Sequence, residues 1–210
     1  MPHVVEILEK SPVVPVLAFE NVDEAINVCR VLYQEGLTVL EITLRHETAL
    51  DAIKAVKADL PEDACVGAGT VTTAQRALDA IHAGAEFGVS PGLTPALAAA
   101  IKPLDWPFLP GVATLTEAMQ ARELGFTALK FFPANLSGGP GFLKAVGSVL
   151  PDLVFCPTGG ISADTAPEYR ALKNVATVGG SWLTPRSHDG TIHTDMVREL
   201  ARIAILAAEE

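Results

Sequence analysis

The chain has 210 residues, of which 49% are hydrophobic and 19% are charged, and its formal net charge is −10 at pH 7. A chain of this length can bury one large core. The acidic balance argues against a nucleic-acid-binding protein, because such proteins gather Lys and Arg against the phosphate backbone. No apolar run approaches the roughly 18 residues of a membrane helix, and the first ten residues lack the features of a secretory signal. We therefore expect a cytoplasmic protein without a membrane partner.

One pattern repeats along the chain: a short apolar block, then an amphipathic stretch, then a glycine. Apolar residues three and four apart between the blocks predict helices, and the apolar blocks predict strands. Thr94 with Pro95, and Thr114 or Thr116 ahead of Glu117, are typical helix starts. The predicted strands lie at 13–19, 38–45, 64–71, 86–92, 106–113, 128–134, 153–160 and 175–183.

Strands that are apolar nearly throughout and alternate with helices indicate a parallel sheet covered on both faces. Eight such units without a break in composition favour closure into a (β/α)8 TIM barrel, formed by a single domain over 1–210. Residues 2–12 predict an extra helix before the first strand. No GxGxxG follows the first strand, which argues against an open dinucleotide-binding sheet.

The second predicted strand carries three polar residues in an apolar run, Glu41, Thr43 and Arg45. Residues two apart project to the same side of a strand, so these side chains are expected to lie on one side. A buried carboxylate is costly without a partner or a purpose, which makes Glu41 a candidate acid/base residue. The alternative is a purely structural Glu–Arg pair that closes the barrel.

Lys130 lies within the apolar block at 128–134, whereas every other lysine falls in a helical or terminal segment where its ammonium can reach water. Removing an amine from water favours its uncharged form, which is the nucleophile that imine chemistry requires. We interpret Lys130 as that nucleophile. In the alternative, its side chain extends past the strand end and keeps the charge in water.

The last two predicted strands end in paired glycines, where backbone N–H groups can approach an anion closely. Thr70, at the end of the third strand, adds a hydroxyl donor at the same carboxyl-terminal edge of the predicted strands. Tight turns without a ligand are the alternative. The residues expected to hold a phosphate are Gly159, Gly160, Gly179, Gly180 and Ser181.

The cysteines and histidines show no metal-binding spacing. Cys29, Cys65 and Cys156 are widely separated, and we expect reduced thiols packed in the core. His188 and His193 lie in a polar segment without a third ligand, so we expect a solvated loop. The sequence therefore predicts neither a metal site nor a cofactor.

A phosphorylated 2-keto sugar acid would suit this set of groups. The set contains an amine, a carboxylate, an Arg and a Thr for an anionic head, and a separate phosphate site. These residues resemble those of the 2-keto-3-deoxy-6-phosphogluconate (KDPG) aldolase family, which also acts on 4-hydroxy-2-oxoglutarate. The resemblance covers nearly the whole chain. It depends on the ordered motifs LEITLR, VGAGTV, VSPGL, LPGVAT, LKFFPA, FCPTGGIS and VGGSWL.

The resemblance implies a role for each matching position. Lys130 corresponds to the Schiff-base lysine and Glu41 to the general acid/base, while Arg45 and Thr70 match contacts to the pyruvate carboxylate. The paired glycines and Ser181 match the phosphate site. The resemblance also implies a metal-independent lyase that assembles as a homotrimer. The remaining residues that it implies for the pocket are Pro91, Phe132 and Thr158.

Three positions depart from the family pattern: His46 and Glu47 replace the common Thr-Pro, and Asn135 replaces the usual Glu. They leave the aldehyde preference open. An aldolase for 4-hydroxy-2-oxoglutarate or for the galactonate-derived epimer is the first alternative, although Thr43 and Arg45 favour the gluconate-type substrate. A metal-dependent pyruvate aldolase and a non-catalytic sugar-phosphate-binding barrel are more distant alternatives.

Overall fold

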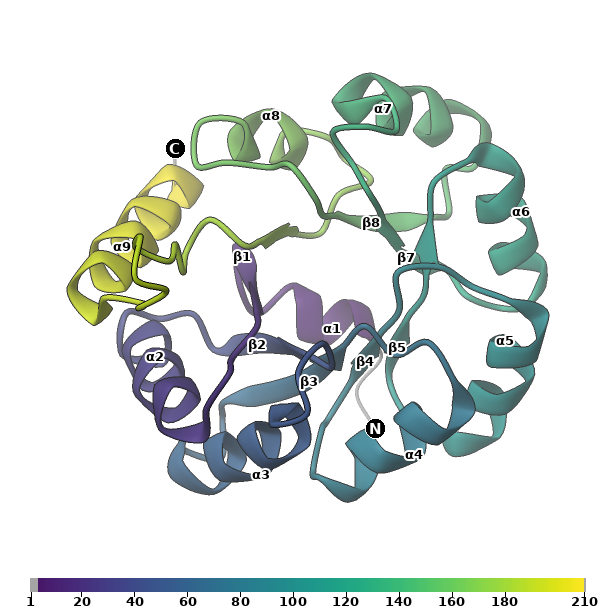
Figure 1. Ribbon diagram of the computed structural model, residues 1–210. Coiled ribbons are helices and arrows are strands. Elements are labelled where there is room, and N and C mark those ends of the chain that lie inside the picture. The colour runs from purple at the N-terminus through teal and green to yellow at the C-terminus, as the bar shows by residue number, and fades with distance from the viewer. Residues whose placement is uncertain (1–3, 210) are drawn as a thin grey trace.

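The computed structural model describes residues 4–209, with parallel strands at the centre and helices around them (Figure 1). The strands are β1 (Val13–Leu17), β2 (Val39–Thr43), β3 (Cys65–Gly69), β4 (Gly88–Val89), β5 (Phe108–Leu109), β6 (Gly111–Val112), β7 (Ala128–Phe131), β8 (Val154–Pro157) and β9 (Val178–Gly180). The helices are α1 (Val4–Leu8), α2 (Val22–Gln34), α3 (Ala49–Asp59), α4 (Ala74–His82), α5 (Pro95–Ile101), the 3-10 helix η1 (Lys102–Leu104), α6 (Leu115–Glu123), α7 (Gly139–Val149), α8 (Ala166–Arg170) and α9 (Thr194–Glu209). The predicted alternation of strands and helices is confirmed.

The strands form two sheets in the orders β5-β4-β3-β2-β1-β9 and β6-β7-β8, and their pairings are parallel. An isolated bridge between Thr158 and Gly179 brings the end of β8 beside β9. The strand predicted at 106–113 is divided at Pro110, which has no N–H to donate to a ladder. The Pro110 carbonyl still accepts a hydrogen bond from the Lys130 N–H at 2.9 Å.

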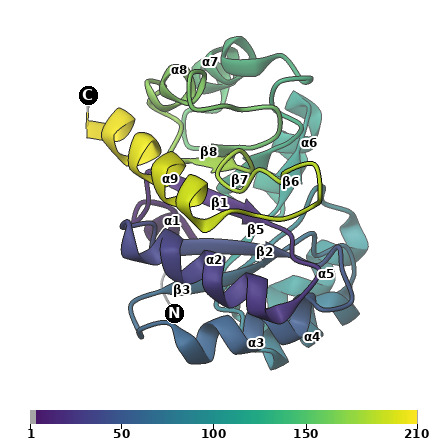
Figure 2. The same ribbon diagram turned by 60° about the vertical axis from the view of Figure 1, so that its left-hand side comes forward.

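The last helix returns to the beginning of the fold. Figure 2 shows α9 running alongside α2, and Arg202 Nε of α9 lies 2.7 Å from Glu35 Oε2 at the end of α2. The two helices cover β1 and β9, which pair directly. Within residues 4–209, no helix combines the length and the apolar character needed to cross a membrane.

The predicted helix starts are confirmed at two positions. Thr94 Oγ1 accepts the Leu97 N–H at 3.1 Å at the start of α5. Thr114, and not Thr116, caps α6: its hydroxyl accepts the Glu117 N–H at 3.2 Å, while the Glu117 carboxylate accepts the Thr114 N–H at 2.9 Å. Each such cap typically stabilises a helix by about 1 kcal/mol.

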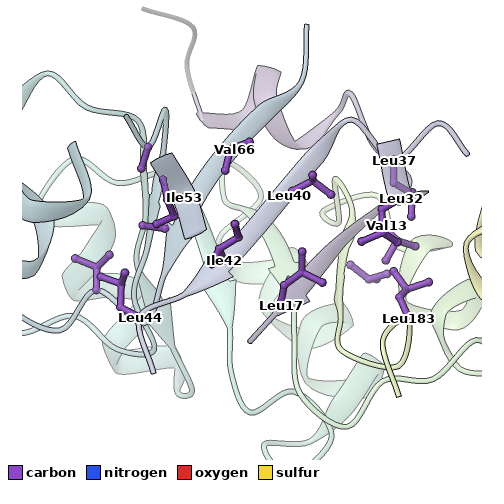
Figure 3. Close-up of a cluster of buried hydrophobic side chains, with 14 of the residues drawn as sticks. Val13, Leu17, Leu32, Leu37, Leu40, Ile42, Leu44, Ile53, Val66 and Leu183 are labelled. Atoms are coloured by element: carbon purple, nitrogen blue, oxygen red, sulfur yellow. The ribbon is translucent and has the colours of Figure 1, made fainter. Parts of the chain in front are cut away.

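Alternation along the strands divides the core into two clusters. Leu40 and Ile42 of β2 lie on the helix side, in one cluster with Leu32 of α2 and Ile53 of α3 (Figure 3). Each of these side chains is fully buried, which contributes about 1.5–3 kcal/mol per residue. The odd-numbered residues of β2 therefore face the other way, toward the space enclosed by the strands.

The second cluster fills that inner space at one end. Val39 of β2 and Phe87, which precedes β4, pack there with Val4, Ile7 and Leu8 of α1. Helix α1 lies inside the ring of outer helices (Figure 1) and covers the amino-terminal ends of the strands. The predicted extra helix is thus confirmed over Val4–Leu8, while residues 2 and 3 lie outside the described part of the chain.

Candidate active site

Lys130 and Glu41 meet in the inner space. Lys130 is the third residue of β7 and Glu41 the third of β2, and the alternation along each strand directs both side chains inward. Lys130 Nζ lies 3.3 Å from Glu41 Oε1, and the exposed fractions of the two side chains are 7% and 4%. The alternative in which Lys130 extends into solvent is therefore wrong.

This pair is a buried ammonium beside a buried carboxylate. Each charge offsets part of the other's desolvation cost, because an isolated charge in such a place would be strongly unfavourable. Glu41 Oε1 accepts the hydrogen bond from Lys130, while the structure gives Oε2 no partner among the described residues. The free oxygen can therefore exchange a proton with a bound water or substrate.

Two of the predicted pocket residues lie close to Lys130. Its Nζ is 5.4 Å from the centroid of the Phe132 ring, within the range of a cation–π contact. Gly111 of β6 is the register partner of Lys130, and a β-carbon on Gly111 would lie 2.3 Å from the backbone of Pro91. The missing side chain at Gly111 lets Pro91 approach the strand next to the amine.

Arg45 does not continue β2, and the prediction that it projects from the strand beside Glu41 is wrong. The strand ends at Thr43, whose carbonyl accepts the Arg45 N–H at 2.8 Å in a tight turn that takes the chain out of the ladder. Arg45 is exposed, and its carboxylate-binding role stays a prediction. Thr43 is buried and donates its hydroxyl to the Leu17 carbonyl at 2.7 Å, which ties β2 to β1.

Thr70 follows β3 in a left-handed backbone conformation, with φ of 60°. A β-branched residue rarely adopts this conformation, which costs about 1–3 kcal/mol and is concentrated at functional sites. Thr70 is half-buried at the carboxyl end of its strand. Its backbone strain supports the prediction of a ligand contact but does not test it.

The paired glycines come together at the ends of β8 and β9. Gly159 and Gly160 have φ of +100° and +73°, so their turn itself requires glycine. Gly179 has an ordinary backbone, but a β-carbon there would lie 2.2 Å from Oγ1 of the buried Thr158. Any side chain at 179 would collide with Thr158, so packing and not a tight turn requires this glycine. The alternative in which all the paired glycines serve only tight turns is therefore incomplete. Anion binding by these loops stays a prediction.

Gly180 and Ser181 are the remaining predicted phosphate-site residues, at the end of β9. A β-carbon on Gly180 would lie 2.5 Å from the Trp182 ring, so this glycine too permits close packing. Ser181 is exposed. Its hydroxyl is thus available at the edge of the glycine loops.

Ser90 is a buried polar residue that the sequence reasoning missed. It is fully buried, and its Oγ lies 3.4 Å from the Gly111 N–H, beside the strand that pairs with Lys130. The available signal was a polar residue inside the apolar block at 86–92. Ser90 therefore links the segment after β4 to the start of β6, the strand that pairs with β7.

The cysteines are free and buried, as predicted. Burial raises the pKa of Cys65 and of Cys156 to about 12, which keeps these thiols protonated. Cys156 is also the register partner of Lys130 on β8. Among the described residues, no three of His, Cys, Asp and Glu gather closely enough to hold a metal ion.

A cavity of about 700 Å³ opens at the opposite end of the strands, where Ile7, Cys65 and Trp106 line it. Neither Lys130 nor Glu41 reaches this cavity. Lys130 and Glu41 differ from the groups that line this cavity, because both of their side chains are buried and Lys130 Nζ donates a hydrogen bond to Glu41 Oε1.

A buried amine beside a carboxylate, on the inner faces of parallel strands, defines a class: enzymes that form imines with carbonyl substrates. The family model described as KDPG and KHG aldolase, in which KHG stands for 4-hydroxy-2-oxoglutarate, matches residues 4–200. A 2-dehydro-3-deoxy-phosphogluconate aldolase of Pseudoalteromonas atlantica is 43% identical over 203 residues, which are 97% of this chain and 94% of the relative.

Solved structures agree with this relationship. The crystal structure of 2-keto-3-deoxy-6-phospho-gluconate aldolase from Zymomonas mobilis matches with a TM-score of 0.91 and 40% identity, over 97% of this chain and 96% of that one. A KDPG aldolase from Legionella pneumophila, with pyruvate captured as a covalent carbinolamine intermediate, matches with a TM-score of 0.91 and 37% identity, over 97% and 98%. The chain belongs to the KDPG and KHG aldolase family.

Proposed function

We propose that this chain is a Schiff-base aldolase that cleaves 2-dehydro-3-deoxy-6-phosphogluconate to pyruvate and glyceraldehyde 3-phosphate. The observation that carries the proposal is the distance of 3.3 Å between Lys130 Nζ and Glu41 Oε1, in an inner space where both side chains are buried. Membership of the family, and the carbinolamine in the Legionella relative, support the same chemistry.

The reaction begins when Lys130 Nζ gives a proton to Glu41 and, as an uncharged amine, adds to the C2 carbonyl of the substrate. The carbinolamine then loses water, and Glu41 shuttles the protons that this loss requires. The product is an iminium that joins Lys130 to C2. Because the iminium withdraws electrons, it can accept the pair that a neighbouring carbon–carbon bond releases.

Carbon–carbon cleavage is the second stage. Glu41, directly or through a water, takes the proton of the C4 hydroxyl, and the C3–C4 bond breaks. Its electron pair moves toward the iminium and forms an enamine, while C4 becomes the aldehyde carbon of glyceraldehyde 3-phosphate. Protonation of the enamine at C3 and hydrolysis of the imine then release pyruvate and regenerate the amine.

The two charged ends of the substrate have separate sites in this proposal. Arg45 and Thr70 bind the carboxylate next to C2, and the glycine loops with Ser181 bind the phosphate. The short separation in sequence supports the first assignment, since Arg45 lies only four residues beyond Glu41. The left-handed turn at Gly159 and Gly160 supports the second, because paired glycines let backbone N–H groups approach an anion closely.

We also propose that the strands close into a (β/α)8 barrel, with β5 and β6 counting as one strand interrupted at Pro110. The bridge between Thr158 and Gly179 and the pairing of β1 with β9 support this closure. The whole chain then forms a single domain. The catalytic pair lies toward the carboxyl ends of the strands, where barrels of this kind carry their chemistry.

The first experiment traps the imine. Wild-type enzyme incubated with pyruvate and sodium borohydride is expected to carry a reduced pyruvyl adduct on Lys130, identified by peptide mass spectrometry. The Lys130→Met variant is expected to remain unlabelled and inactive, whereas Lys144→Met, which removes an exposed lysine of α7, labels like the wild type. Labelling at any other lysine contradicts the proposal.

The second experiment separates the role of Glu41 from that of Lys130. Glu41→Gln keeps the shape of the side chain but cannot take a proton, so kcat is expected to fall by about 10²–10⁴-fold. Borohydride trapping by this variant is slower but still occurs at Lys130. Full turnover in Glu41→Gln would remove Glu41 from the mechanism.

A second substrate is a specific alternative, because the matching family description names KHG together with KDPG. Turnover of 4-hydroxy-2-oxoglutarate, of the gluconate-derived acid and of its galactonate epimer should be compared on one preparation. We expect the highest kcat/KM for the gluconate-derived acid. A non-catalytic barrel that binds sugar phosphates would cleave none of the three.

We further propose a cytosolic homotrimer that needs no metal. Three buried, unpaired thiols suit a reducing compartment. Large apolar side chains remain exposed on one chain, among them Leu136 at 84% and Leu206 at 62%, which a subunit interface could cover. Light scattering is expected to give three times the mass of one chain, and a mass of one chain would contradict the trimer.

A further inference from the structure

The turn after β2, which carries Arg45, receives a hydrogen bond from Arg76 of α4. Within the turn, the Leu44 N–H donates to the Gly69 carbonyl at 2.9 Å, and the Arg45 N–H donates to the Thr43 carbonyl at 2.8 Å. Arg76 Nη1 donates to the Leu44 carbonyl. Because the Leu44 carbonyl and the Arg45 N–H belong to one peptide unit, both sides of the peptide before Arg45 are held.

Arg76 occupies a position in α4 where a cation is locally unfavourable. It lies in the first turn of the helix, where the Thr73 hydroxyl caps the helix by accepting the Arg76 N–H at 3.2 Å. The N-terminus of a helix carries partial positive charge, which an arginine opposes. Within residues 4–209, no carboxylate lies within ion-pair distance of Arg76. The contact with the turn therefore explains this arginine better than its helix does.

Side-chain packing does not fill the space between the turn and α4. A cavity of about 210 Å³ lies there, and Leu44, His46, Leu50 and Arg76 are among the residues that line it. In the described part of the chain, the bond from Arg76 is the only hydrogen bond that joins α4 to residues 43–47. A charged donor beside a cavity thus supports the turn where packing does not.

The same turn is also tied to Thr70, the other residue proposed to bind the substrate carboxylate. Gly69, whose carbonyl accepts the Leu44 N–H, directly precedes Thr70 in the chain. Arg76 lies only six residues beyond Thr70 and returns to the Leu44 carbonyl. The segment from 69 to 76 therefore holds the turn at both of its ends.

We propose that Arg76 is a positioning residue, which orients Arg45 toward the carboxylate of the 2-keto acid by holding the peptide before it. This inference rests on the proposed function and deepens it. Arg76 does not contact the substrate but acts through Arg45. Without its hydrogen bond the turn samples other orientations, so carboxylate binding weakens while imine formation at Lys130 is preserved.

The test uses pyruvate, which carries a carboxylate and a carbonyl but no phosphate. The rate of borohydride trapping at Lys130 is measured over a range of pyruvate concentrations. Arg76→Met keeps an unbranched apolar stem but loses the donor, and we expect its half-saturating pyruvate concentration to rise by about three- to tenfold. The trapping rate at saturation should stay within about twofold of the wild type. Arg76→Lys, which retains a charged N–H donor, should recover most of the affinity.

A double-mutant cycle identifies the residue through which Arg76 acts. In the Arg45→Ala background, Arg76→Met should change the half-saturating concentration by less than about twofold, because the residue that it positions is absent. The matched control is Lys54→Met, which removes one positive charge from the exposed face of α3 and should leave half-saturation within about twofold. Thermal unfolding verifies that each variant is folded.

Three results would overturn the inference. In the first, half-saturation of Arg76→Met stays within twofold of the wild type. In the second, Arg76→Met has the same effect with and without Arg45, so that the two residues act independently. In the third, Arg45→Ala itself binds pyruvate like the wild type. Each of these leaves trapping at Lys130 intact, whereas a wild type that traps no pyruvate and cleaves no substrate would overturn the proposed function itself.

Discussion

Glu41 occupies the volume that a side chain at position 69 would need. A β-carbon on Gly69 would lie 2.1 Å from Glu41 Oε1, the oxygen that accepts the hydrogen bond from Lys130. Gly69 is the last residue of β3 and pairs with Thr43 of β2, so the two strands hold this contact on the inner face. The position of the carboxylate thus depends on a glycine in the neighbouring strand.

Gly69→Ala is therefore expected to displace the Glu41 carboxylate from Lys130. Since a misplacement of about 1 Å can cost about 10²-fold, we expect kcat to fall by roughly that factor. Steady-state kinetics measure this loss, and Gly141→Ala serves as the control. Gly141 has no neighbour within 4 Å of its missing β-carbon and lies in α7, so alanine there should be neutral or slightly stabilising. Wild-type kcat in Gly69→Ala would show that the contact does not position Glu41.

Lys130→Met should lower the free energy of unfolding, because it leaves the Glu41 carboxylate buried without its cation. Breaking such a pair from one side typically costs about 3–5 kcal/mol. The double variant Lys130→Met with Glu41→Gln removes both charges and is expected to recover most of that loss. Urea unfolding of the wild type, the two single variants and the double variant measures the coupling. A double variant less stable than both single variants would contradict this account of the pair.

Asp189 should titrate well below the ordinary carboxyl range. The Ser187 hydroxyl, 2.5 Å from Asp189 Oδ1, and the Thr191 N–H, at 3.0 Å, hold the pKa of Asp189 at about 2, compared with an ordinary value of 3.8. Because the folded pKa lies below the unfolded one, the contribution of this group to stability is present above about pH 4. It is lost as the pH falls toward 2.

Carbon-13 NMR of the carboxyl groups measures this titration directly. Ser187→Ala removes the largest contribution and should raise the pKa of Asp189 toward its ordinary value. A wild-type midpoint near 3.8 for Asp189 would show that the turn does not form as described.

Removing divalent metals should not affect catalysis. The iminium on Lys130 accepts the electrons of the broken bond, so the proposed mechanism needs no Lewis acid. Dialysis against EDTA is expected to leave kcat/KM for the phosphorylated acid within about twofold of the untreated enzyme. In the proposed mechanism Glu41 transfers the protons and Lys130 forms the imine, and neither step uses a metal. Loss of activity that added Mg²⁺ or Mn²⁺ restores would favour the metal-dependent alternative.

Local alternation was enough to predict much of the site. Glu41 and Lys130 each interrupt an apolar strand at a position whose neighbours pack against helices, so their inward direction follows from the period of two. The Thr114 cap and the Gly159 turn follow from local chemistry in the same way. These features depend on residues a few positions apart.

Other features depend on local backbone conformation or on contacts between distant segments, and the pattern of apolar residues encodes neither. The end of β2 at Thr43, which leaves Arg45 outside the strand, is set by a turn hydrogen bond. The close approach of Glu41 to Gly69 and of Asn135 to Gly160 arises only when neighbouring strands are in register. The left-handed backbone of Thr70 contradicts the ordinary preference of a β-branched residue, and local propensity therefore could not predict it.

The packing of α1 has a consequence for the order in which reactants move. Val4, Ile7 and Leu8 close the inner space at the amino-terminal ends of the strands. The substrate and both products must therefore enter and leave at the carboxyl-terminal ends. In the proposed mechanism, pyruvate is still covalently attached to Lys130 when the aldehyde forms. The aldehyde therefore leaves first and the keto acid last, and in the synthetic direction the keto acid must load before its partner.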